Sequence, residues 1–350
     1  MIVLRGDNEV RGTPSRRARV VGLALAILAA TAPTLCAQDA DSLAAALKDA
    51  RALIDRGRAG EAALKLRGLG QLDDARVRHL LGVALYHDDD YAAAIDTLNG
   101  LAGQFADGTA ERREIEQVLG LSLYLAGRFP EALPYLERTQ AWAADNLELH
   151  YVLGMAYIQT QRPEAARRAF ARTFGVPPDS AGAHVVTAQM MVRLEMEALA
   201  EAELKQALAL DARIPHANYL LGQQAIFRGR LDEGIALTKR ELEINPGNAM
   251  AFYQLGDAYL RQNRWDESIA ALQQSLWINP YYSGPYILLG RAYLKKDRPA
   301  TAEGMLRRAI EYDPNNRVAH YLLGQLLQQL GRLEEAKREL EIAEKLPGAR

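Results

Sequence analysis

The chain has 350 residues, of which 49% are apolar and 25% are charged, with both signs interspersed. This composition is globular and excludes a disordered chain. The formal net charge of −2 gives no overall attraction to nucleic acid or to an acidic membrane surface, so nucleic acid is not an expected partner.

Residues 1–37 are typical of a secretory signal peptide. A group of arginines precedes an apolar run at 20–32, and Ala37 supplies a small residue at the expected cleavage site. Cys36, the only cysteine, would leave with this segment, so no disulfide or Cys metal site is expected in the mature chain.

An uncleaved membrane anchor is the alternative for the same segment, because residues 20–37 carry no charge and are just long enough to span a bilayer. The positive charges on its N-terminal side place the following residues outside the cytoplasm in both cases. We therefore expect an exported protein, periplasmic or otherwise extracytoplasmic, that meets a membrane only through this segment if it stays uncleaved.

After a short segment at 38–42, a 34-residue pattern fills residues 43–350. A Leu-Gly pair marks it at Leu81-Gly82, Leu119-Gly120, Leu153-Gly154, Leu221-Gly222, Leu255-Gly256, Leu289-Gly290 and Leu323-Gly324. Alignment on these glycines gives blocks that start near 43, 75, 113, 147, 181, 215, 249, 283 and 317. The step from 75 to 113 is longer because four extra residues lie within 101–112.

The pattern of each block predicts a pair of helices. Apolar residues recur at helical spacing, as in Phe252, Leu255 and Tyr259. The glycine faces a small residue at the twentieth place of the block, which lets two helix backbones approach closely. Turns between the helices are signalled by Gly127-Arg128, Gly229-Arg230, Asn263-Arg264 and Gly331-Arg332. Second helices are expected to stop before Pro178, Pro246, Pro280 and Pro314.

These positions resemble the tetratricopeptide repeat over nearly the whole mature chain. The resemblance implies an all-α fold: a right-handed superhelical solenoid of antiparallel helix pairs, with about nine repeats. No pair can bury its apolar stripe alone, so neighbouring pairs must stack. The fifth block departs most, with Thr187-Ala188 in place of Leu-Gly, and we expect the superhelix to be least regular there and at 101–112.

The resemblance also implies that the first helices line a concave groove that holds a protein partner, a peptide or a helix. Groove-facing places in that family are the second, fifth, ninth, twelfth and thirteenth of each block. The candidate partner-binding residues are Tyr151, Met155, Ile158, Tyr219, Gln223, Phe227, Tyr253, Asp257, Arg261, Arg291, Lys295 and Tyr321. Tyrosines at the fifth place could instead pack on their neighbours, since aromatic residues are common there.

No metal, cofactor or catalytic site is expected. His150, His184 and His320 share the fourth place of their blocks, but equivalent residues of packed helices lie about 10 Å apart, too far to share one tetrahedral ion. No phosphate-binding loop, nucleophile elbow or zinc-protease motif occurs.

The leading hypothesis is therefore a non-enzymatic protein-interaction scaffold outside the cytoplasm, of the kind that serves envelope assembly, secretion or polysaccharide export. The alternative is a glycan-binding component of a polysaccharide-export apparatus, because tyrosine faces can stack on sugar rings. The partner, the pathway and the oligomeric state do not follow from the sequence.

Overall fold

Eighteen α-helices and one short 3₁₀ helix, with no strand, make up the part of the chain that the computed structural model describes: residues 35–347, with the backbone alone for residues 35–41. The helices are α1 (Leu35–Asp55), α2 (Ala59–Gly68), α3 (Ala75–His87), α4 (Tyr91–Leu98), η1 (Ala102–Gln104), α5 (Ala110–Leu125), α6 (Phe129–Trp142), α7 (Leu147–Gln159), α8 (Pro163–Phe174), α9 (Ala181–Arg193), α10 (Glu197–Leu210), α11 (Ala217–Phe227), α12 (Leu231–Ile244), α13 (Ala249–Arg261), α14 (Trp265–Ile278), α15 (Ser283–Lys295), α16 (Pro299–Tyr312), α17 (Arg317–Gln329) and α18 (Leu333–Lys345).

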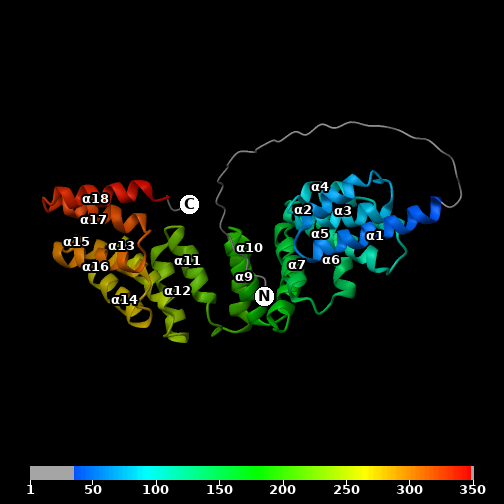
Figure 1. Cartoon of the computed structure of the whole chain (residues 1–350). Helices are drawn as coiled ribbons and strands as arrows, with labels where there is room; N and C mark the ends of the chain where they lie inside the picture. Colours follow the sequence, from blue (N-terminus) through cyan, green and yellow to red (C-terminus); the bar gives the residue numbers. More distant parts are fainter. Residues whose placement is uncertain (1–34, 348–350) are drawn as a thin grey trace.

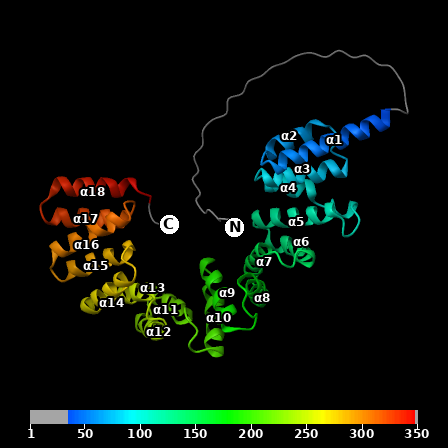
Figure 2. The same ribbon diagram turned by 60° about the horizontal axis from the view of Figure 1, so that its bottom comes forward.

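Consecutive helices pack as nine pairs, and each pair stacks on the next in chain order (Figure 1). The expected all-α solenoid of nine helix pairs is confirmed. The pairs follow an arc, with α11 and α13 on its inner side and α12 and α14 on its outer side (Figure 2). First helices therefore provide the inner face of this stretch, and second helices provide the outer face.

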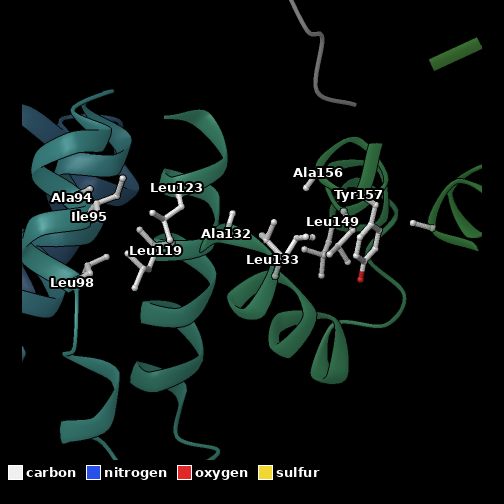
Figure 3. Packing of buried hydrophobic residues seen from close by; sticks show 14 of the residues in the cluster. Ala94, Ile95, Leu98, Leu119, Leu123, Ala132, Leu133, Leu149, Ala156 and Tyr157 are labelled. Atoms are coloured by element: carbon white, nitrogen blue, oxygen red, sulfur yellow. The ribbon is translucent and has the colours of Figure 1, made fainter. Parts of the chain in front are cut away.

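The helices form because their apolar residues fall on one stripe. In α13 the buried residues Ala251, Leu255, Ala258 and Tyr259 recur at the spacing of one helical face. The apolar stripes of successive helices pack against one another and form a shared core. Figure 3 shows this between α4, α5, α6 and α7, where buried leucines from different helices meet.

In seven of the nine pairs, close packing depends on the repeated glycine. A β-carbon at Gly154 would lie 2.6 Å from the ring of Phe170, and one at Gly256 would lie 2.5 Å from Cγ of Leu272. The space beside these two glycines is thus filled by a large side chain at the twenty-fourth place, and not only by the small residue at the twentieth. The glycine therefore lets a bulky side chain of the second helix pack against the backbone of the first.

Every pair turns through one residue in the left-handed backbone region, with φ between 55° and 78°. These residues all stand at the fifteenth place of their blocks: Gly57, Asp89, Gly127, Gln161, Glu195, Gly229, Asn263, Asp297 and Gly331. Seven of the nine are glycine, asparagine or aspartate, which tolerate this conformation, whereas Gln161 and Glu195 do not favour it. The turn geometry is thus imposed by the packing of the pair where the residue does not favour it.

Three places differ from the regular pattern. Helix α1 begins at Leu35, so residues 38–42 continue a helix and do not form a separate segment. The extra residues within 101–112 hold η1, and α5 starts at Ala110. Ala188 is buried, and α9 and α10 are as long as the corresponding helices of several other pairs. The irregular junction comes afterwards, where His216, ahead of α11, has a φ of 71°.

The expected signal segment lies outside the described residues, except for residues 35–37 at the start of α1. Within the described part of the chain, no helix combines the length and apolarity that a bilayer span requires.

Replacing Gly154 with Ala is expected to lower the free energy of unfolding by about 1–3 kcal/mol, because the new methyl group overlaps the Phe170 ring. Gly304 is the matched control: it is exposed in α16, and an added β-carbon would meet no atom within 4 Å. Gly304→Ala should stabilise the chain by up to about 1 kcal/mol through helix propensity. Urea unfolding followed by circular dichroism measures both, and similar shifts in the two variants would refute the packing role.

Candidate functional site

A pocket of about 180 Å³ opens between two neighbouring first helices, α11 and α13. We call it the α11–α13 pocket. Its lining residues are Tyr219, Gln223, Ile226, Phe227, Met250, Tyr253, Gln254, Asp257 and Arg261. Six of them are among the twelve candidate groove residues, so half of the candidates gather at one place.

Aromatic side chains form the apolar part of the pocket. Tyr219 and Tyr253 are half-buried, whereas Phe227 keeps 76% of its surface exposed. The ring of Tyr253 packs edge-on against Tyr282, with ring centroids 5.3 Å apart. Burial, and next the neighbouring Tyr282, raise the pKa of Tyr253 and of Tyr219 above the usual value for tyrosine, so both hydroxyls stay protonated at neutral pH. They offer an apolar face with a neutral polar tip.

The floor of the pocket is polar. The Gln254 amide donates from Nε2 to Oγ1 of Thr238 at 2.6 Å and to the Tyr219 carbonyl at 3.3 Å. Its Oε1 atom, and both amide atoms of the nearby Gln224, are buried without a hydrogen-bond partner. Buried amide atoms without a partner are rare in folded proteins, so Gln224 and Gln254 set this point of the array apart from the regular apolar core.

Sequence reasoning missed Gln254 and Gln224, although a signal was present. Gln254 stands at the sixth place, which is apolar in every other block from 75 onward. Gln224 stands at the tenth place, where the other blocks carry Ala, Ser, Met or Leu. A polar residue that interrupts a repeated core position marks the junction of α11 and α13.

One ion pair lies at the edge of the pocket. Arg261 donates to Asp257 at 2.8 Å along α13, and its guanidinium lies 3.5 Å from the Ile226 carbonyl at the end of α11. Arg291 and Lys295 follow on α15, where both are exposed and have no hydrogen bond or ion pair within the described residues.

The remaining candidates lie elsewhere. Ile158 is completely buried in the core and cannot line a groove, because the twelfth place of α7 points into the packing between helices. Tyr151 packs against Phe170, and its hydroxyl donates to the Met190 sulfur at 3.9 Å. Met155 is half-buried on the same helix. Tyr321 is 48% exposed in α17 and accepts a hydrogen bond from Gln325.

The three histidines of the fourth place are buried, and each has its own local partner. His150 contacts the Ala144 carbonyl at 2.7 Å, His184 contacts the Glu203 carboxylate at 2.7 Å, and His320 contacts the Glu339 carboxylate at 2.6 Å. The contacts of His184 and His320 join the two helices of a pair, and that of His150 holds the loop between α6 and α7. Among residues 35–347, no group of three or more His, Cys, Asp or Glu side chains is arranged to hold a metal ion.

A second cavity, of about 450 Å³, lies near the first repeats and is lined in part by Arg51, His79, Glu114 and Trp142. Arg51 donates two hydrogen bonds to the Glu114 carboxylate, which His79 contacts at 2.7 Å. Burial alone would raise the pKa of Glu114, but the hydrogen bonds with His79 and Arg51 outweigh burial and lower the pKa to about 2.

The Glu114 network should make stability depend on acid pH. Its pKa is lower in the folded state than the ordinary value of 4.5, so its stabilisation is complete above pH 4.5 and is lost as the pH falls towards 2. The urea midpoint of the wild type should therefore fall more steeply between pH 4.5 and 2 than that of Glu114→Gln. Parallel pH profiles would contradict the assignment.

Surface and core candidates should respond differently to truncation. Phe227→Ala is expected to change the free energy of unfolding by less than about 0.5 kcal/mol, because the ring is largely exposed. Ile158→Ala should cost about 2–5 kcal/mol, because the side chain is fully buried. Urea unfolding compares the two, and an equally large loss from Phe227→Ala would show that its ring supports the fold.

Several solved structures are similar to parts of the chain. A structure of PilF from Pseudomonas aeruginosa is 21% identical and covers 58% of this chain and 93% of its own, with a TM-score of 0.47. A MamA structure from Desulfovibrio magneticus RS-1 is 20% identical and covers 48% of this chain and 95% of its own, with a TM-score of 0.44. The Cut9–Hcn1 complex is 18% identical over 81% of this chain and 55% of its own, with a TM-score of 0.45. No curated protein matches the sequence.

Two family profiles match the sequence, and both are described as tetratricopeptide repeat. One matches residues 123–189 and 293–348, and the other matches residues 219–283. Together they cover more than half of the chain, and the matched segments lie within the array of stacked helix pairs. The chain therefore belongs to the tetratricopeptide repeat family, whose repeats are non-enzymatic protein-interaction modules.

Proposed function

We propose that the protein is a scaffold that holds a segment of a partner protein in a concave groove, at the α11–α13 pocket. The observation that carries this proposal is Phe227, which keeps 76% of its surface exposed beside two half-buried tyrosines. Such an exposed ring gains free energy when a partner covers it. The ring of Phe227 is therefore the proposed contact for a side chain of the partner.

The size of the pocket supports a side chain as its occupant. A volume of about 180 Å³ is below the range of roughly 300–1,000 Å³ that is common for small-molecule sites. Aromatic walls and amide groups suit an apolar side chain that is flanked by peptide groups. A cofactor or a whole small molecule fits this geometry less well.

We further propose that the scaffold works outside the cytoplasm. Support comes from the arginine-rich, then apolar, pattern of residues 1–37. Envelope assembly, secretion and polysaccharide export are all processes that an exported repeat scaffold could serve. Glycan binding is the competing function for the same tyrosines, and the following experiment separates it from protein binding.

Site-specific photocrosslinking tests the proposed function. A benzoylphenylalanine in place of Gln223, which lines the pocket, should crosslink a partner protein in an extract of the producing cells. The matched control carries the same group in place of Gln274, which is exposed on the outer helix α14. Phe227→Ala in the Gln223 derivative should lower the yield about tenfold, a loss typical of an interface hot spot.

Equal yields from the two positions, or a yield that Phe227→Ala leaves unchanged, would refute binding at this pocket. A crosslinked product that contains carbohydrate and no peptide would favour the glycan alternative. Tyr219→Ala combined with Tyr253→Ala should lower the yield further, with circular dichroism as the check that the helices persist.

A further inference from the structure

Cationic side chains continue the surface of the α11–α13 pocket onto the next first helix. Arg261 on α13 and Arg291 and Lys295 on α15 form what we call the cationic strip. Helices α13 and α15 contact each other directly, so these residues belong to one continuous surface. All three are exposed.

The charge on this surface is unbalanced. The ninth and thirteenth places of α11, α13, α15 and α17 hold Gln223, Phe227, Asp257, Arg261, Arg291, Lys295, Gln325 and Gln329. The single acid among them, Asp257, is already paired with Arg261. Arg291 and Lys295 remain without an acidic partner within the described residues, which leaves two positive charges for a ligand.

The repeat sets the distance between the pocket and these two charges. Equivalent positions on packed helices lie about 10 Å apart. An extended peptide rises about 3.3 Å per residue, so about three residues bridge the pocket and the α15 cations.

The amides on the same surface favour an extended ligand over a helical one. Gln223 and Gln329 have no hydrogen-bond partner within the described residues, and each side chain can both donate and accept. A helix satisfies its own backbone groups, whereas an extended chain presents free N–H and C=O groups to such amides.

We propose that the partner segment is an extended acidic peptide. It places one apolar side chain in the α11–α13 pocket and a carboxylate, about three residues away, over Arg291 and Lys295. This inference rests on the proposed function and adds the chemistry and the spacing of the ligand.

Fluorescence anisotropy with the full chain and synthetic probes tests this proposal. Each labelled dodecapeptide carries one Phe and a Glu pair, separated by one to six residues on one side or the other, in a Gly/Ser/Gln background. The tightest probe should have a separation of about three. Replacement of its Glu pair by Lys should weaken binding about fivefold or more, and added salt should remove most of the difference.

Variants test whether the cationic strip causes the preference for the Glu probe. R291Q with K295Q should abolish the preference for Glu over Lys, whereas R240Q, which removes an exposed cation from α12, should preserve it. Equal affinity of the Glu and Lys probes, independence of their separation, or an unchanged preference in R291Q/K295Q would overturn the inference. If no probe binds, the acidic-peptide inference fails, while crosslinking at Gln223 still decides whether the pocket binds a protein.

Discussion

The close contact between the two helices of a pair is the constraint on which the rest of the structure depends. At Gly154 and Gly256 the absence of a β-carbon leaves room for a large side chain of the second helix. This contact fixes how the two helices lie against each other, and its repetition every 34 residues gives successive pairs the same orientation. Stacking then buries the stripes that single pairs leave exposed. The residues of the first helices that take no part in this packing form the inner face.

The candidate site lies where this regular core is interrupted. One buried apolar cluster extends from Leu43 to Leu220, and separate, smaller clusters follow it. On α11 and α13, beyond the end of the first cluster, Gln224 and Gln254 place amide atoms without a hydrogen-bond partner in the interior. Phe227 projects into solvent beside them. These buried amides and the most exposed phenylalanine of the described residues therefore lie on the same two helices, as is common where a surface is shaped for binding and not for stability.

The glycine register was sufficient to predict the helix pairs, because the glycines stand where the two helices of a pair pack closely. It also predicted six residues of the α11–α13 pocket, because places within a block correspond to faces of a helix. It failed at Ile158, since this side chain of α7 is completely buried in the core. The left-handed turn at Gln161 and the role of Gln254 were missed because tertiary packing overrides the local preference of these residues. Unpaired charge at Arg291 became evident only once the neighbouring side chains were placed.

A pair that carries the repeated glycine holds its place through the glycine contact and through its immediate neighbours. Amide hydrogen exchange of a Gly154→Val variant, compared with the wild type, tests it most directly. We expect faster exchange in α7 and α8, smaller changes in the adjoining α6 and α9, and none in α15 to α18. Faster exchange that extends equally over all the described helices would contradict nearest-neighbour stacking. Unchanged exchange in α7 and α8 would contradict the role of the glycine.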